Sequence, residues 1–148
     1  LHDETAELLR EKAQEYGTTT GRGRRVGWFD AFASRYSRQI NGCTGMVFTR
    51  LDILDGFSSV KICVGYQVGN EAIDYFPADI ALQEKCVPVY EELPGWDTPT
   101  ASSTKKDQLP VNALNYIQRV EDLVGCPVQI ISTGPRREET ILVEPVLV

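Results

Sequence analysis

Short β-rich runs alternate along this chain with segments whose apolar residues recur at helical spacing. A period of 3.6 residues predicts a helix, and a compact apolar run bounded by turn residues predicts a strand. The predicted helices cover residues 2–15, 28–40 and 110–124. The predicted strands cover residues 46–48, 60–68, 73–76, 87–90, 127–131 and 140–143. This alternation predicts an α/β fold, with a mixed sheet and flanking helices.

Local signals predict where these segments end. The three predicted helices are each followed by a glycine, which closes a helix readily: Gly17, Gly42 and Gly125. Gly69-Asn70 predicts a hairpin, and the proline inside 87–90 predicts an edge strand, because proline cannot donate to a sheet. Residues 94–108 are rich in Pro, Ser and Thr and are predicted to form a surface loop.

Length and charge limit the class of protein. The 148 residues are 42% hydrophobic and carry a net charge of −6. This length predicts one domain, residues 1–148, that is large enough to bury a core. The acidic balance argues against a nucleic-acid surface, and no apolar run reaches the ~18 residues of a membrane span. The polar amino end shows no secretory signal, so we expect neither a nucleic-acid nor a membrane partner.

The four cysteines show no metal or redox spacing. They are Cys43, Cys63, Cys86 and Cys126, without a Cys-x-x-Cys pair. The apolar or small neighbours of all but Cys86 predict core cysteines, and we expect reduced thiols in a cytoplasmic protein. The one histidine, His2, lies at the start of a predicted helix. The chain therefore offers no histidine placed for general-base chemistry.

Residues 16–25 carry the densest set of anion-binding groups. They read YGTTTGRGRR, with three threonines, three arginines and three glycines. Glycine lets the backbone approach a ligand closely, while threonine hydroxyls and arginine forks bind carboxylate or phosphate oxygens. The segment predicts a loop that holds a small anion. A mobile polar turn with its arginines in solvent is the alternative.

Residues 49–52 and 132–135 follow two predicted strands, and ligands of α/β folds bind at the carboxyl ends of strands. The first segment, TRLD, resembles the Asn/Thr-Lys-x-Asp element by which GTP-binding proteins select guanine. The Asp52 carboxylate can accept from the ring N–H and the exocyclic amine of guanine, a donor pair that adenine lacks. The Arg50 side chain can lie over the base. The hydroxyl and amides of 132–134 can hold the guanine carbonyl, although each segment alone is also compatible with an ordinary turn.

Seven ordered motifs together resemble the carboxyl-terminal portion of adenylosuccinate synthetase. They are EYGTTTGRGRR at 15–25, GWFD at 27–30, NG at 41–42, TRLDILDG at 49–56, KICVGY at 61–66, LPGW at 93–96 and STGP at 132–135. The resemblance covers essentially the whole chain, more weakly at 67–86 and 97–108. It implies that the chain is the carboxyl-terminal part of a larger GTP-dependent ligase fold.

The resemblance also implies a reaction. The family joins IMP and L-aspartate with GTP and Mg²⁺ in AMP biosynthesis, through 6-phosphoryl-IMP, and works as a homodimer. Its phosphate loop, catalytic aspartate and catalytic histidine lie upstream, so no catalytic or metal-binding residue is expected in this segment, and Mg²⁺ would be bound by the upstream part. The chain alone is expected to be inactive. A non-catalytic guanine-nucleotide binding module and a domain with vestigial motifs are the alternatives.

Site residues follow from the matched motifs. The resemblance implies that Thr19 and Thr20 contact the carboxylates of aspartate, that Arg22 bridges aspartate and IMP, and that Arg24 lies near the nucleotide phosphates. The implied aspartate and IMP site comprises Thr18, Thr19, Thr20, Gly21, Arg22, Gly23 and Arg24. The implied GTP site comprises Arg24, Arg50, Leu51, Asp52, Ser132, Thr133 and Gly134.

Two positions depart from the family pattern. Arg50 stands where lysine is common and should still stack on a base. Gly23 stands where proline or arginine is frequent, which predicts a more flexible loop at 18–24.

Overall fold

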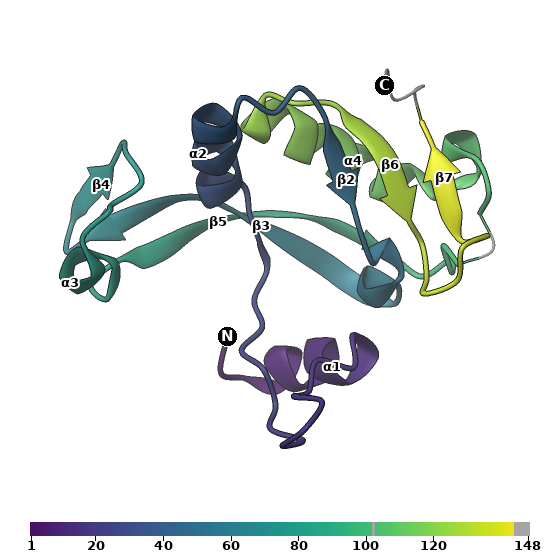
Figure 1. Cartoon of the computed structure of the whole chain (residues 1–148), viewed down its shortest axis with the longest axis horizontal. Helices are drawn as coiled ribbons and strands as arrows, with labels where there is room; N and C mark the ends of the chain where they lie inside the picture. The colour runs from purple at the N-terminus through teal and green to yellow at the C-terminus, as the bar shows by residue number, and fades with distance from the viewer. Residues whose placement is uncertain (102, 144–148) are drawn as a thin grey trace.

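The computed structural model describes residues 1–101 and 103–143. It shows two β-sheets with helices packed against them, and α1 below both sheets in the view of Figure 1. The elements are α1 (Glu4–Lys12), β1 (Phe29–Asp30), α2 (Ala31–Asn41), β2 (Met46–Phe48), the 3-10 helix η1 (Leu51–Leu54), β3 (Phe57–Val68), β4 (Glu71–Ile73), α3 (Ile80–Gln83), β5 (Val87–Trp96), the 3-10 helix η2 (Lys106–Gln108), α4 (Val111–Val124), β6 (Val128–Ser132) and β7 (Thr140–Leu142).

The larger sheet is built on β3. Strand β5 runs antiparallel to it along one side, from Phe57 opposite Trp96 to Gln67 opposite Val87. The other side of β3 pairs with β1 in parallel and with β4 in a hairpin. The predicted hairpin and the predicted edge position of the Pro88 strand are confirmed. The β4 and α3 end of this ribbon projects away from the rest of the molecule in Figure 1.

The smaller sheet has the order β2-β6-β7. Strand β2 pairs with β6 in parallel, and β7 returns antiparallel to β6. Because parallel strands end at the same edge of a sheet, the segments that follow β2 and β6 lie next to each other. The predicted α/β class is confirmed, with two mixed sheets in place of one.

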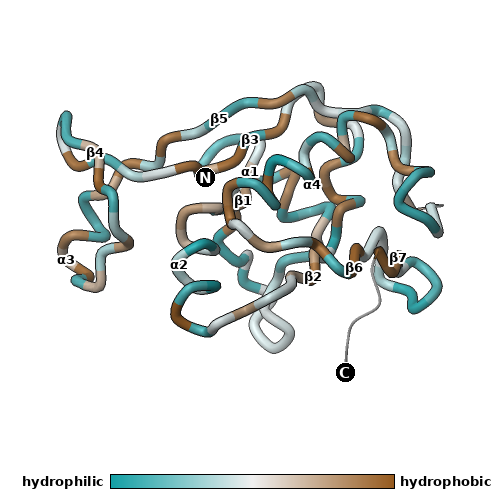
Figure 2. Tube along the Cα trace, turned by 90° about the horizontal axis from the view of Figure 1, so that it is seen from above, coloured by the Kyte–Doolittle hydropathy of each residue, from teal (hydrophilic) through white to brown (hydrophobic). Residues whose placement is uncertain are grey.

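Helix α4 joins the two sheets into one core. Figure 2 shows it between the β3–β5 ribbon and the β2–β6–β7 sheet. The predicted inward stripe is buried, and α4 also contacts α2 and β5. Full burial of each such aliphatic side chain stabilises the fold by about 1.5–3 kcal/mol. The buried residues of α4 are Ala113, Tyr116, Ile117, Val120 and Val124.

Short polar side chains and glycines set the helix ends. The Asp3 carboxylate accepts from the amide of Ala6 at 3.0 Å and begins α1. The Asp30 carboxylate does the same for α2, accepting from the amide of Ala33 at 2.8 Å. Gly42 and Gly125 close α2 and α4 in the left-handed conformation, as predicted.

Several predicted boundaries are wrong because tertiary contacts override local pattern. The first helix ends at Lys12, and the chain turns at Gln14, whose φ is 50°, before it reaches Gly17. The second helix begins only at Ala31, because Phe29 pairs with β3 as strand β1. Its predicted apolar face is incomplete, since Ile40 is 64% exposed.

Other differences lie around the long ribbon. The strand after the hairpin covers 71–73, which is earlier than predicted. The predicted loop at 94–108 begins only after Trp96, since β5 continues to pair with β3. A side chain at 95 would overlap the carbonyl of Phe57, so glycine is required there. Helix α3 was not predicted. All four cysteines are free, but Cys43 is exposed rather than in the core.

Within the described ranges 1–101 and 103–143, no helix has the length and apolar character needed to cross a membrane.

Candidate functional site

A pocket of about 510 Å³ lies at the shared carboxyl ends of β2 and β6. Residues 49–52 line one part of it and residues 132–135 line another, while the end of α1 contributes a third wall. The structure therefore brings together the two segments predicted to form one pocket. The lining residues are Lys12, Ala13, Gln14, Thr49, Arg50, Asp52, Ile53, Ser132, Gly134 and Pro135.

Leu51 fixes the first wall from within the core. Its side chain is fully buried, so Leu51 faces the core cluster and does not line the pocket. Arg50, just before it, adopts the left-handed conformation with φ 58° and ψ 46°, which is uncommon for a residue with a side chain. The buried leucine and this turn place the side chains of Arg50 and Asp52 on the pocket side.

Asp52 lines this pocket and carries an unsatisfied acceptor oxygen. Its Oδ1 is buried and has no hydrogen-bond partner among the described residues. Burial raises the pKa of Asp52, the carboxylates of Asp55 and Glu139 raise it further, and the Arg50 guanidinium and a backbone hydrogen bond oppose them. An unsatisfied buried polar group costs about 1–3 kcal/mol. An unpaired acceptor on a residue that lines the pocket makes Asp52 a candidate to bind a hydrogen-bond donor of a ligand.

The second wall is a tight turn organised by Glu139. The Glu139 carbonyl accepts from the amide of Thr133 at 2.9 Å, and its carboxylate accepts from the amide of Arg136 at 2.7 Å. A side chain at Gly134 would overlap that carboxylate. Thr133 is fully buried and turned toward Glu139, so its side chain does not line the pocket. Ser132 and Gly134 do line it.

Residues 16–25 form a closed turn after α1. The backbones of Tyr16 and Gly23 pair in an isolated antiparallel β-bridge, and the amide of Gly17 donates to the carbonyl of Arg22 at 2.9 Å. Gly21, with φ 64°, makes the turn possible. The residues at the tip are exposed to solvent, as an anion-binding loop requires: Thr18, Thr19, Thr20, Gly21 and Arg22.

Gly23 has a packing role at the base of this turn. A Cβ at this position would lie 2.8 Å from Cδ of Arg10. The Arg10 side chain crosses the turn there and donates from Nε to the carbonyl of Arg24 at 3.0 Å. The greater loop flexibility expected from Gly23 remains a prediction, but the structure gives glycine a second use, which is room for Arg10.

Glu15 links the turn to the pocket, which sequence reasoning missed. Its carboxylate accepts from Nη1 of Arg24 at 2.9 Å and from Nη1 of Arg50 at 2.8 Å. Arg50 also donates to the carbonyl of Ala13, at the end of α1. Glu15 belongs to the EYGTTTG motif, but nothing in that motif shows which residues its carboxylate would contact.

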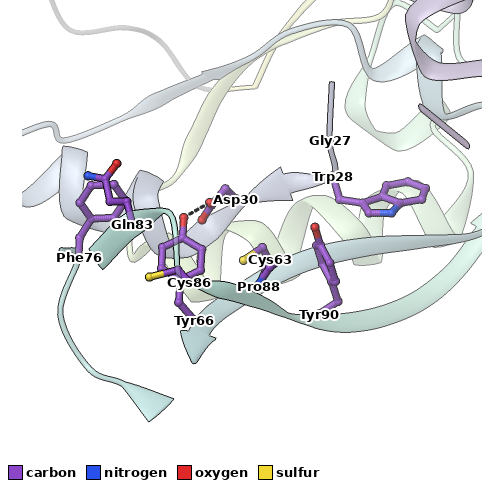
Figure 3. Close-up of a pocket in the computed structure, with 10 residues that line it drawn as sticks. All are labelled: Gly27, Trp28, Asp30, Cys63, Tyr66, Phe76, Gln83, Cys86, Pro88 and Tyr90. Atoms are coloured by element: carbon purple, nitrogen blue, oxygen red, sulfur yellow. Dashed lines mark hydrogen bonds between the residues drawn. The ribbon is translucent and has the colours of Figure 1, made fainter. Parts of the chain in front are cut away.

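A second pocket of about 350 Å³ is lined by residues of the segment 27–30, of strands β3 and β5, and of the segment 76–86 (Figure 3). The hydroxyl of Tyr66 donates to Asp30, whose other oxygen caps α2. Burial raises the pKa of the Cys63 thiol to about 11, so this thiol is protonated at neutral pH. Both oxygens of Asp30 already accept hydrogen bonds, so this second pocket is the weaker candidate for a ligand site.

No group of three or more His, Cys, Asp or Glu side chains that could hold a metal occurs within residues 1–101 and 103–143. Polar binding at the first pocket and at the turn is the chemistry that they support.

Comparisons with known proteins agree with the resemblance. The sequence model of the adenylosuccinate synthetase family matches residues 1–141. Adenylosuccinate synthetase of Trichlorobacter lovleyi is 47% identical over 144 residues, covering 97% of this chain and 34% of that protein. That of Dehalococcoides mccartyi is 50% identical over 141 residues, covering 95% of this chain and 33% of that protein. This chain spans about a third of the length of these curated relatives.

A solved structure agrees with the fold. The structure of fully ligated adenylosuccinate synthetase from Plasmodium falciparum matches with a TM-score of 0.92 and 34% sequence identity. The match covers 97% of this chain and 35% of that one. The prediction that this chain has the fold of part of a larger protein is confirmed.

The raised pKa of Asp52 makes a prediction about stability. The ionised carboxylate is less favourable in the folded than in the unfolded chain. The contribution of Asp52 to the free energy of unfolding therefore falls as the pH rises from the unfolded-state pKa of 3.8 through the higher pKa of the folded chain. Without ligand, Asp52→Asn should therefore raise the free energy of unfolding at pH 7 by about 0.5–1 kcal/mol, a low value because the carboxyl is partly exposed. Urea unfolding at pH 7 and pH 4 measures this gain, which should shrink at pH 4.

The matched control is Asp97→Asn, which replaces an exposed aspartate outside the pocket. It should change the free energy of unfolding little at either pH. A loss of stability in Asp52→Asn, or a gain that is the same at both pH values, would contradict the environment assigned to Asp52.

Proposed function

This chain belongs to the adenylosuccinate synthetase family, and we propose that it forms the guanine-binding and aspartate-binding third of a GTP-dependent ligase. The proposed reaction joins IMP and L-aspartate through 6-phosphoryl-IMP and gives adenylosuccinate, GDP and phosphate. The ligase would act in the cytoplasm as a homodimer and use Mg²⁺. By itself this chain would bind and orient substrates without catalysing the reaction.

The unsatisfied Oδ1 of Asp52 is the observation that carries this proposal. Guanine presents a ring N–H and an exocyclic amine side by side, and a carboxylate can accept from both. Arg50 lies on the same wall of the pocket, where its alkyl stem can cover the base. Ser132 and Gly134 lie on the other wall and would meet the guanine carbonyl. Adenine would leave Asp52 unpaired, which supplies the selectivity.

The turn at 16–25 would hold the second substrate. Thr19 and Thr20 at its tip can donate to the two carboxylates of L-aspartate, while Arg22 would bridge aspartate and IMP. Arg24 belongs to this turn and donates to the Glu15 carboxylate, which also accepts from Arg50 of the pocket. It would contact aspartate on one side and the nucleotide on the other. These residues contribute orientation, which lowers the entropic barrier to a reaction between bound molecules.

The chemistry of phosphate transfer would come from outside this chain. Mg²⁺, when bound, neutralises charge on the transferred phosphoryl group, but the described residues lack a cluster to hold it. We assign no step through Mg²⁺ to this chain. A guanine-nucleotide binding module without ligase activity is the alternative, because the same pocket would serve both functions.

Guanine selectivity tests the pocket. Asp52→Ala removes the acceptor for both guanine donors, and hydrogen bonds to a charged group contribute about 1.5–3 kcal/mol. The Kd for GDP should therefore rise about 10- to 100-fold, while the Kd for ADP stays weak and unchanged. Calorimetric titration of the native polypeptide, meaning the complete ligase of which this chain is proposed to form a third, measures both constants with each nucleotide. Asp97→Ala is the control, and a pocket variant that still prefers GDP would refute the assignment.

Steady-state kinetics test the loop. In the native polypeptide, Arg22→Leu removes a guanidinium proposed to touch both aspartate and IMP. The KM for aspartate should rise and kcat should fall, with kcat/KM lower by about 10- to 100-fold, as for a lost charge-assisted contact. Arg137→Leu, at an exposed arginine outside both sites, should leave the kinetics unchanged. An unchanged KM for aspartate in Arg22→Leu would remove Arg22 from the site.

A further inference from the structure

We propose that Glu15 is a positioning residue that couples guanine binding to aspartate binding, an inference that rests on the function proposed above. Its carboxylate is the point where the two candidate sites meet. Oε2 accepts from Arg24 of the turn at 2.9 Å, and Oε1 accepts from Arg50 of the pocket at 2.8 Å. Each oxygen therefore serves one site.

The backbone of Glu15 is held in place on both sides. Its amide donates to the carbonyl of Arg10 at 3.0 Å, and its carbonyl accepts from the amide of Arg24 at 2.9 Å. The Glu15 side chain is 27% exposed, whereas those of Arg24 and Arg50 are 58% and 50% exposed. Glu15 is thus the least exposed member of the three, and the two longer side chains meet at its carboxylate.

Arg50 depends on this anchor for its place in the pocket. Its Nη1 donates both to Glu15 and to the carbonyl of Ala13, so the guanidinium is drawn toward the end of α1. Ala13 and Gln14 line the same pocket. A guanidinium can make these two bonds from one nitrogen and still offer two other nitrogens, whereas a lysine ammonium would use two of its three protons on them. This gives arginine at position 50 a role that lysine would fill less well.

The shared carboxylate predicts the sign of the coupling between the two ligands. Ordering a long arginine side chain costs up to about 2 kcal/mol of conformational entropy. A ligand that binds Arg24 also orders Glu15, so Arg50 has less freedom left to lose when guanine binds. Without the carboxylate, the two guanidinium groups would also repel each other. We therefore expect positive coupling between the two ligands.

The expected coupling is modest, because ion pairs between partly exposed side chains contribute little on their own. Coupling between sites usually spans about 5- to 150-fold in affinity, and we expect about 5-fold here. The native polypeptide, saturated with IMP, is titrated with GDP in the absence and in the presence of saturating L-aspartate. The measured quantity is the ratio of the two Kd values for GDP. A uniform loss of affinity for either ligand cancels in this ratio.

Glu15→Gln should bring this ratio close to 1, because its NH₂ group cannot accept, so one of the two arginines loses its partner oxygen. Glu15→Asp is the second variant: it keeps the charge but loses one methylene of reach, so it should also bring the ratio close to 1. Glu11→Gln changes an exposed glutamate on α1 and should keep the wild-type ratio of about 5. The thermal unfolding midpoint of each variant shows whether it folds.

The outcomes separate this inference from the function on which it rests. A native polypeptide that does not bind GDP would refute the proposed function and, with it, the coupling. GDP binding with a wild-type ratio near 1 would refute the coupling alone. A wild-type ratio in Glu15→Gln would show that Glu15 does not carry it. Full coupling in Glu15→Asp would show that charge, rather than the two-armed bridge, is responsible.

Discussion

The parallel pairing of β2 with β6 is the constraint on which the candidate pocket depends. It places residues 49–52 beside residues 132–135, although most of the chain lies between them. The pairing is held by a core in which α4 fills the space between the two sheets. Because β2 and β6 are adjacent strands, their pairing sets how far apart the two walls of the pocket stand, and the core around α4 supports that sheet.

The pocket contains an unpaired acceptor that lowers the stability of the fold, which a purely structural site would not need. Asp52 keeps an unsatisfied oxygen in a partly buried place, next to other carboxylates that raise its pKa. The neighbouring Leu51 is locked in the core, so the backbone cannot turn Asp52 away to relieve this cost. Stability lost at such a position is commonly recovered when a ligand binds. The glutamate bridge at Glu15 then connects this pocket to the turn at 16–25.

Local patterns in the sequence predicted the helices and strands better than the tertiary contacts that these elements make. The stripe of α4, the strands around 46–48 and 127–131, and both left-handed glycine caps follow from periodicity and turn chemistry. The two pocket segments followed from the rule that ligands bind at strand ends. Strand β1 could not be predicted, because a two-residue strand exists only through its pairing with β3. The inward turn of Thr133 depends on Glu139 in the same way, since such contacts leave no local periodicity.

A crystal structure of the native polypeptide with GDP tests the central claim most directly, which is that the β2–β6 edge forms a guanine pocket. The account predicts the base between Arg50 and the turn at 132–134, with the ring N–H and the exocyclic amine donating to Asp52. The Oδ1 atom that has no partner among the described residues would then be satisfied. A base bound elsewhere, such as in the pocket of Figure 3, with Asp52 still unpaired, would contradict the account.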